Sequence, residues 1–210
     1  MSVLEKLSSQ VGDRSEAANL QVVEQCLAER GLLAEIAQGL HSRDAALAGD
    51  CAEVMTKVAE RQPDWVVPYA EGLSGLLGHK QTRPRWEAAH ALALVAATAP
   101  QVVGPLLPRF AEIIHKDGST IVRDYTIDTV ANYASLDAGA AREAFPILQA
   151  ALTLWNGKHA AHALNGLVNV SQNAAELNPE LHALSQPYLE DPRGVVRKAA
   201  RRLQKASRIE

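Results

Sequence analysis

Residues 88–92 of this chain read Ala-Ala-His-Ala-Leu, and residues 160–164 read Ala-Ala-His-Ala-Leu again, 72 positions later. The first copy completes a longer stretch that begins at Arg85 and reads Arg-Trp-Glu-Ala-Ala-His-Ala-Leu. Self-similarity at a fixed period indicates a repeat architecture, in which stacked units bury a core that no unit can bury alone. If the 72 residues span two repeats, each structural repeat is about 36 residues long.

The residues between these copies have the periodicity of helices. Apolar residues recur at three- and four-residue steps, which is the spacing of one helix face. Two such runs are Val103, Leu106, Leu107, Phe110, Ile113 and Ile114, and then Phe145, Leu148, Ala151, Leu152 and Trp155. Aromatic residues make up only 4% of the 210 residues, and no segment alternates as a β-strand would. The predicted fold class is therefore all-α.

Proline is expected near the start of several helices. Pro68, Pro108 and Pro146 follow one another at steps of 40 and 38 residues. A proline is tolerated in the first turn because the N–H that it lacks would be mostly unpaired there. Each unit then consists of two antiparallel helices, A and B. We expect a single domain, residues 1–210, of about six pairs, with units near residues 1–30, 31–63, 64–100, 101–137, 138–179 and 180–210.

The B helices share a pattern of Arg, two residues, Ala-Ala, one residue, a small residue, and Leu or Val. The stretch from Arg85 fits this pattern well, and the stretch from Arg123 fits it with substitutions. Arg14 begins a partial copy, and the copy at Arg197 has its arginine displaced by one position. The pattern predicts closely approaching B helices, because small side chains let neighbouring helices pack tightly.

With the helix-A prolines and the step Asp-x-x-x-x-Val-Arg from Asp117 to Arg123, this pattern resembles the HEAT repeat family over essentially the whole chain. The resemblance implies a right-handed α-solenoid, with A helices outside and B helices lining a concave face. It also implies that the arginines of the pattern pair with an Asp of a neighbouring repeat, for which Asp117 is one candidate. HEAT arrays serve many roles, so the resemblance does not specify a function.

One stripe of each B helix faces outward, because positions two, six, nine and thirteen counted from the arginine share a helix face. Position six holds Asn19, His90, Asp128, His162 and Arg201, and position two holds Ser15, Trp86, Asp124 and Lys158, with Arg197 near that row. We predict that a partner binds to this polar row. The predicted partner-binding residues are Trp86, His90, Asp124, Asp128, Lys158, His162, Asn165 and Asn169.

Trp86 is the large apolar exception in this row. An exposed tryptophan beside histidine and arginine is typical of a binding hot spot. The plainer alternative is that Trp86 packs under the preceding loop and that His90 is merely solvated, since isolated apolar surface residues are common. The sequence leaves both interpretations open.

Charge is uneven along the chain, whose formal net charge is −3. Residues 193–210 contain seven basic residues and one acidic residue, whereas the remaining chain contains 14 basic and 23 acidic residues. The basic patch comprises Arg193, Arg197, Lys198, Arg201, Arg202 and Lys205. It is either the solvated face of a helix that caps the array, or a site for nucleic acid or an acidic peptide. The acidic remainder favours the cap.

No motif points to catalysis. The chain contains no Cys-x-x-Cys, His-Glu-x-x-His, Gly-x-Gly-x-x-Gly, phosphate-loop or Gly-x-Ser-x-Gly sequence. His159 and His162 have the spacing of a metal-binding pair, but no nearby Cys or carboxylate completes a ligand set, so we interpret them as exposed surface histidines. Cys26 and Cys51 fall in helical patterns and are predicted to be buried thiols. We expect no enzyme activity, no cofactor and no metal.

The predicted function is a non-catalytic scaffold that binds a peptide or protein on the concave face. We expect a cytoplasmic protein without a membrane span, which needs roughly 20 apolar residues, and without a signal peptide. The alternative is nucleic-acid binding. Alkylpurine DNA glycosylases are built of HEAT-like repeats, and by that resemblance Trp86, Tyr125, Asp124 and Asp128 would supply their aromatic and carboxylate groups. The two carboxylates would repel a phosphate backbone, which disfavours this alternative.

Overall fold

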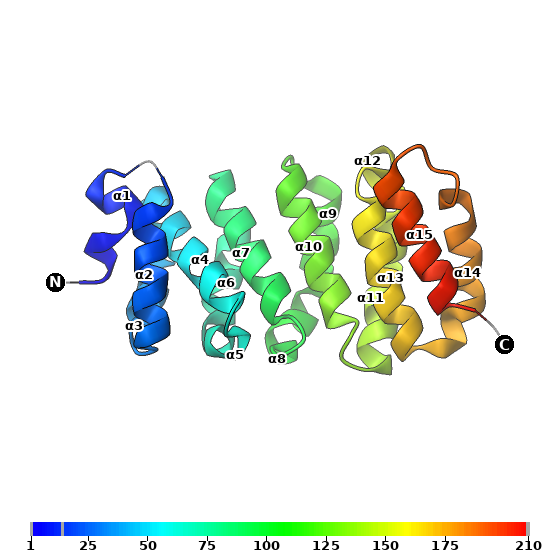
Figure 1. Ribbon diagram of the computed structural model, residues 1–210, viewed down its shortest axis with the longest axis horizontal. Helices are drawn as coiled ribbons and strands as arrows, with labels where there is room; N and C mark the ends of the chain where they lie inside the picture. The colour runs from blue at the N-terminus through cyan, green and yellow to red at the C-terminus, as the bar shows by residue number, and fades with distance from the viewer. Residues whose placement is uncertain (1, 14, 209–210) are drawn as a thin grey trace. The chain divides into compact units, whose positions relative to one another are not determined.

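The computed structural model describes residues 2–13 and 15–208, and every regular element among them is a helix (Figure 1). α-Helices alternate with short 3₁₀ turns, and no strand occurs in this part of the chain. The predicted all-α fold class is therefore confirmed. Arg14, which begins one partial copy of the B-helix pattern, lies outside the described residues.

The chain divides into two compact units, Met1–Val102 and Val103–Glu210. The first unit contains α1 (Ser8–Val11), α2 (Ala17–Ala28), α3 (Leu32–Gly39), α4 (Ala45–Ala59), α5 (Pro63–Val66), α6 (Ala70–Gly75) and α7 (Thr82–Val95). The pairs are α1 with α2, α3 with α4, and the interrupted helix α5–α6 with α7. Within this unit α4 packs against both α2 and α7.

The second unit repeats the same arrangement. It follows α8 (Pro100–Val103) and contains α9 (Leu107–Lys116), α10 (Thr120–Tyr133), α11 (Ala138–Ala151), α12 (Leu154–Gly157), α13 (Ala160–Asn173), α14 (Asn178–Ser185) and α15 (Gly194–Ala206). The pairs are α9 with α10, α11 with α13, and α14 with α15, so the six predicted pairs are confirmed. The single domain stays a prediction. None of the described helices is long and apolar enough to cross a bilayer.

Proline occupies helix starts less regularly than expected. Pro108 lies in the first turn of α9, as predicted, and Pro68 lies in the first turn of a short 3₁₀ helix. The prediction is wrong for Pro146, which lies inside α11. This helix begins earlier because the Asp137 carboxylate caps its first turn, accepting a hydrogen bond of 2.8 Å from the amide of Ala140.

Small residues set the distance between neighbouring helices. A Cβ atom built on Gly166 of α13 would lie 2.7 Å from the Cβ of Ala131 of α10, closer than two carbon atoms can pack. In the first unit, a Cβ on Gly39 would collide with the sulfur of Cys51. Cys26 and Cys51 are both fully buried, as predicted, and burial raises the pKa of these thiols to about 11 and about 12. They therefore stay protonated at neutral pH.

Enlarging Gly166 should destabilise the second unit. We expect Gly166→Val to lower the free energy of unfolding by about 2 kcal/mol, because the added carbons must displace Ala131 or its neighbours. Gly75→Val is the matched control, since no atom lies within 4 Å of the Cβ position at Gly75. Urea denaturation measures both variants. Equal losses of stability would contradict the close approach at Gly166.

Candidate functional site

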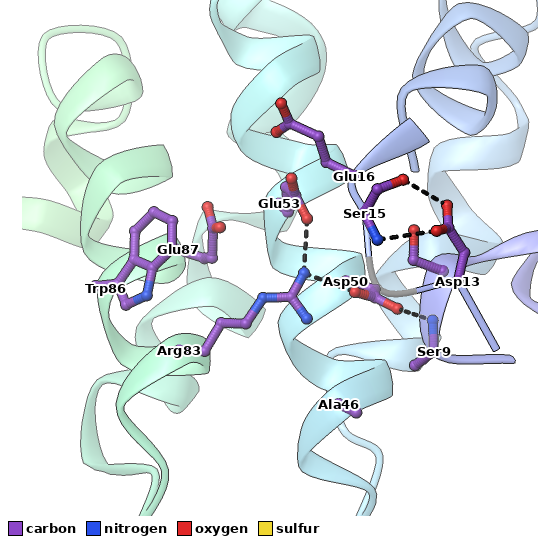
Figure 2. A pocket seen from close by; sticks show the side chains of 11 residues that line it. Ser9, Asp13, Ser15, Glu16, Ala46, Asp50, Glu53, Arg83, Trp86 and Glu87 are labelled. Atoms are coloured by element: carbon purple, nitrogen blue, oxygen red, sulfur yellow. Dashed lines mark hydrogen bonds and ion pairs between the residues drawn. The ribbon is translucent and has the colours of Figure 1, made fainter. Parts of the chain in front are cut away.

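A polar pocket of about 580 Å³ lies in the first unit (Figure 2). Its lining residues come from α1, the following loop, α4 and α7. They are Ser8, Ser9, Asp13, Ser15, Glu16, Ala46, Asp50, Glu53, Arg83, Trp86 and Glu87. Five of these side chains are carboxylic acids and one is a guanidinium, so the pocket is acidic. Trp86 is the one lining residue that the sequence predicts to bind a partner.

Two buried carboxylates of α4 form the floor of the pocket. Asp50 and Glu53 are three residues apart, so both project from one face of the helix. The Arg83 guanidinium, from α7, lies between them, with its Nη2 atom 2.7 Å from Asp50 Oδ1 and 2.7 Å from Glu53 Oε2 (Figure 2). These salt bridges join α4 to α7 and neutralise part of the buried negative charge.

Asn19 of α2 supports the same two carboxylates from the other side. Its Nδ2 atom donates to Asp50 Oδ1 at 3.0 Å and to Glu53 Oε2 at 2.8 Å, and the amide of Ser9 donates to Asp50 Oδ2 at 2.7 Å. Burial pushes the pKa of Asp50 up, but the hydrogen bonds from Asn19, Ser9 and Arg83 outweigh it, so this pKa lies below its ordinary value. Asn19 is itself buried, so this member of the predicted outward row has a structural role.

Glu87 differs from these two carboxylates because it lacks a cationic partner. Its side chain is almost fully buried on α7, and no Lys or Arg of the described chain forms an ion pair with it. Burial, and then the charge of Glu53, raise the pKa of Glu87 to about 8, against the partial opposition of Arg83 and Lys57. Glu87 is therefore mostly a neutral carboxylic acid at neutral pH, set beside a half-buried Trp86.

In the second unit, a buried histidine connects α10 to α13. The Nε of Arg123 donates to His159 Nε2 at 2.8 Å, and His159 Nδ1 lies 2.6 Å from Asp124 Oδ1. Because a guanidinium only donates, Nε2 must accept and Nδ1 must carry the proton toward Asp124. Burial lowers the pKa of His159, so the imidazole is neutral. The interpretation of His159 as an exposed surface histidine is wrong, because its side chain is fully buried.

His162 is half-buried one turn further along α13. Its Nδ1 lies 2.8 Å from Asp128 Oδ1, and its Nε2 lies 3.7 Å from Asp124 Oδ1. The hydrogen bond to Asp128 raises the pKa of His162, with the charges of both carboxylates in support. No set of three or more metal-ligating side chains occurs in the described chain.

Trp155 packs against Arg123 through a turn that the sequence pattern does not predict. The pattern continues a helix through Trp155, yet α11 ends at Ala151, and both Trp155 and Asn156 have left-handed backbones with φ of 53° and 55°. The Arg123 guanidinium lies 3.8 Å from the centroid of the indole ring, whose Nε1 donates to the carbonyl of Ile114 at 2.9 Å. These contacts hold two non-glycine residues in a strained conformation.

The other predicted residues of the second unit lie close to α10. Lys158 Nζ donates to Thr120 Oγ1 at 2.9 Å, and Asn169 Nδ2 donates to the carbonyl of Ala131 at 2.8 Å. Asn169 thus satisfies a carbonyl near the end of α10, while Asn165 is exposed. Of the predicted binding residues, the structure brings His162 together with Asp124 and Asp128. In the first unit, the side chain of His90 is half-buried on α7.

The arginines of the B-helix pattern hold the loops that precede their own helices. Arg85 Nη1 donates to the carbonyl of His79 at 2.8 Å, and Arg197 Nη1 donates to that of Asp191 at 2.6 Å. Arg123 Nη1 donates to the carbonyl of Asp117 in the same way. Each acceptor lies six residues before its arginine. The pairing of an arginine with the Asp117 carboxylate of a neighbouring repeat stays a prediction.

This shared hydrogen bond corrects the alignment of α15. It places Arg197 at position one, whereas the sequence pattern displaces the arginine by one residue. Lys198 and Arg202 therefore occupy positions two and six of the row, in place of Arg197 and Arg201. Arg193 of the predicted basic patch pairs with Asp191 at 2.8 Å and donates to the carbonyl of Gly157, so it holds a loop.

No family model matches the sequence, and no curated protein matches it. Among solved structures, a designed armadillo repeat protein in complex with peptide (KR)4 is 16% identical, with a TM-score of 0.77 and 98% of each chain covered. A computationally designed armadillo repeat protein for modular peptide recognition is 18% identical, with a TM-score of 0.73, covering 97% of this chain and 98% of the other.

A natural protein is also similar. An archaeal HEAT-like repeat protein from Thermococcus onnurineus NA1 is 11% identical, with a TM-score of 0.58, covering 91% of this chain and 92% of the other. At these identities the likeness shows the fold alone. The chain has the helical-repeat solenoid fold class of the armadillo and HEAT-like repeat proteins.

The raised pKa of Glu87 predicts a pH-dependent stability. Between its ordinary value of 4.5 and about 8, the folded chain holds a proton that the unfolded chain releases, so the free energy of unfolding falls as pH rises. We expect Glu87→Gln to flatten this slope in urea denaturation at several pH values. Glu71→Gln, at an exposed position of α6, is the control and should leave the slope in place.

The pKa values of His159 and His162 should shift in opposite directions from the ordinary histidine value. Long-range ¹⁵N–¹H spectra at pH 6.5 should show His159 neutral, with its proton on Nδ1, and His162 more than half protonated. The contribution of His159 to stability is lost as pH falls below 6.5, because the unfolded imidazole gains the proton first. That of His162 is lost as pH rises through its raised pKa. A protonated His159 at pH 6.5 would contradict this network.

Proposed function

We propose that this chain is a non-catalytic scaffold that binds a peptide segment of a protein partner, and that the acidic pocket beside Trp86 anchors a basic side chain of that segment. The observation that carries the proposal is the composition of the pocket, in which, among the described lining residues, five carboxyl groups are set against one guanidinium, that of Arg83. An ammonium or guanidinium group is the chemistry that such a pocket attracts.

The lining residues suggest how a basic side chain would be held. Asp13 and Glu16 stand at the more exposed parts of the pocket and would attract the cation, while Glu87 would accept a hydrogen bond from it through its carboxyl oxygen. The indole of Trp86 would cover the aliphatic part of the guest and attract its charge through the ring face. Asp50 and Glu53 remain committed to Arg83 and Asn19, so they keep the pocket in shape.

Two of the similar structures support a peptide as the partner. One designed armadillo repeat protein is in complex with the peptide (KR)4, and another was designed for modular peptide recognition. A peptide of alternating Lys and Arg therefore also makes a suitable probe here. The other predicted residues would add polar contacts on the B helices: His90, Asp124, Asp128, Lys158, His162 and Asn165, with Asn169 acting by positioning α10.

The proposal includes the type of repeat. We assign the repeats to the HEAT type because the arginine of the B helix recurs at Arg85, Arg123 and Arg197 with the same hydrogen bond to the preceding loop. The glycosylase alternative has less support. The carboxylates of Asp124 and Asp128 are engaged by His159 and His162, which leaves them poorly placed to act on a base.

The peptide (KR)4 tests this function directly. We expect a fluorescein-labelled (KR)4 peptide to bind the wild-type chain in an anisotropy titration at low salt, and Trp86→Leu to weaken binding about tenfold, as for a moderate hot spot. Trp65→Leu is the matched control, because Trp65 is also half-buried in the first unit but does not line the pocket. Absence of binding, or equal losses in the two variants, would exclude the pocket as the anchor.

A further inference from the structure

Helix α15 carries a stripe of unneutralised positive charge. Lys198, Arg201, Arg202 and Lys205 are all exposed, and within the described chain none of the four forms an ion pair. Their spacing of three, one and three residues places them along one side of the helix. The stripe is not part of the acidic pocket, which lies in the other unit.

The stripe borders a shallow hollow that is wide open to solvent. The hollow has a volume of about 440 Å³ and is lined by Gly194, Arg197, Lys198, Arg201, Arg202 and Lys205. The opposite side of α15, including Val196, Ala199 and Leu203, is buried, so the helix cannot rotate to release these cations. The positive side chains are therefore held close together although each pair of them repels.

The alignment of α15 places two of these cations in the outward row of the B helices. With Arg197 at position one, Lys198 and Arg202 correspond to Lys158 and His162 of α13. Helices α13 and α15 pack side by side (Figure 1). The stripe thus continues the polar face of α13. A helix that only capped the array would not need its charges to line up with that face.

We propose that the face of α15 binds an acidic peptide segment, whose carboxylates pair with Lys198, Arg202 and Lys205. Charge complementarity selects the partner, since the lining residues of the hollow are all basic or neutral within the described part of the chain. This site is separate from the proposed function of the acidic pocket and takes a ligand of opposite charge.

The length of the stripe favours a short acidic segment over nucleic acid. From Lys198 to Lys205 it extends roughly 10 Å along the helix axis, which matches about three residues of an extended peptide. Packed helices are about 8–10 Å apart. A long polyanion leaving α15 would therefore cross α13 and reach Asp124 and Asp128 of α10, which would repel its phosphates.

The test uses a fluorescein-labelled octapeptide of alternating Asp and Glu. We expect it to bind the wild-type chain in an anisotropy titration at low salt and to weaken as salt is added. The triple variant Lys198→Gln/Arg202→Gln/Lys205→Gln should bind it about tenfold more weakly. The control variant Lys80→Gln/Lys116→Gln/Arg142→Gln removes the same net charge from exposed positions that are not part of α15 and should change affinity less than about twofold.

Three results would overturn the proposal: no binding of the acidic peptide, equal losses in the two triple variants, or tighter binding of a labelled DNA duplex that the α15 variant abolishes. The last result would make α15 a nucleic-acid site. The (KR)4 peptide separates this proposal from the function of the pocket, because the α15 variant should bind that peptide as the wild-type chain does. Circular dichroism and the melting temperature confirm that both variants fold.

Discussion

In the described chain, an arginine ties each of the B helices α7, α10 and α15 to the loop that precedes it. Buried or partly buried carbonyls need hydrogen-bond donors, which can come from the backbone, from side chains or from water. Arg85, Arg123 and Arg197 provide the donors by reaching back six residues from the first or second turn of the helix. In α15, this contact and the burial of Val196, Ala199 and Leu203 together determine which residues point outward. Trp86 of the acidic pocket and Lys198 of the α15 stripe each directly follow one of these arginines in the sequence.

The sequence predicts the fold class, the six helix pairs and the burial of Cys26 and Cys51, because these depend on local periodicity. It fails at Pro146 and Trp155, where local pattern and tertiary contacts disagree. Asp137 starts α11 earlier than the proline suggests, and the stacking of Trp155 on Arg123 stabilises a turn in place of another helical turn. Helix propensity is a weak preference that such contacts override.

The sequence predicts less of the candidate site than of the fold, because the main groups of the site come together from different repeats. Trp86 was predicted, but Asp50, Glu53 and Glu87 were not. One signal was present: Asp50 and Glu53 interrupt the apolar run from Ala45 to Ala59, and charges on a buried helix face require partners. The prediction that His159 is exposed is wrong because its partners also belong to another repeat. Its partners Arg123 and Asp124 lie 36 and 35 residues away, so no local pattern reveals its burial.

The neutral state of Glu87 couples cation binding in the acidic pocket to the pH of the solution. A guest cation bound beside this carboxyl would favour its ionised form, so occupancy of the pocket would release a proton into solvent. Guest and proton are then competitors for the same oxygen atoms. Affinity for a basic side chain would increase with alkalinity, and the heat of association would depend on the ionisation enthalpy of the buffer.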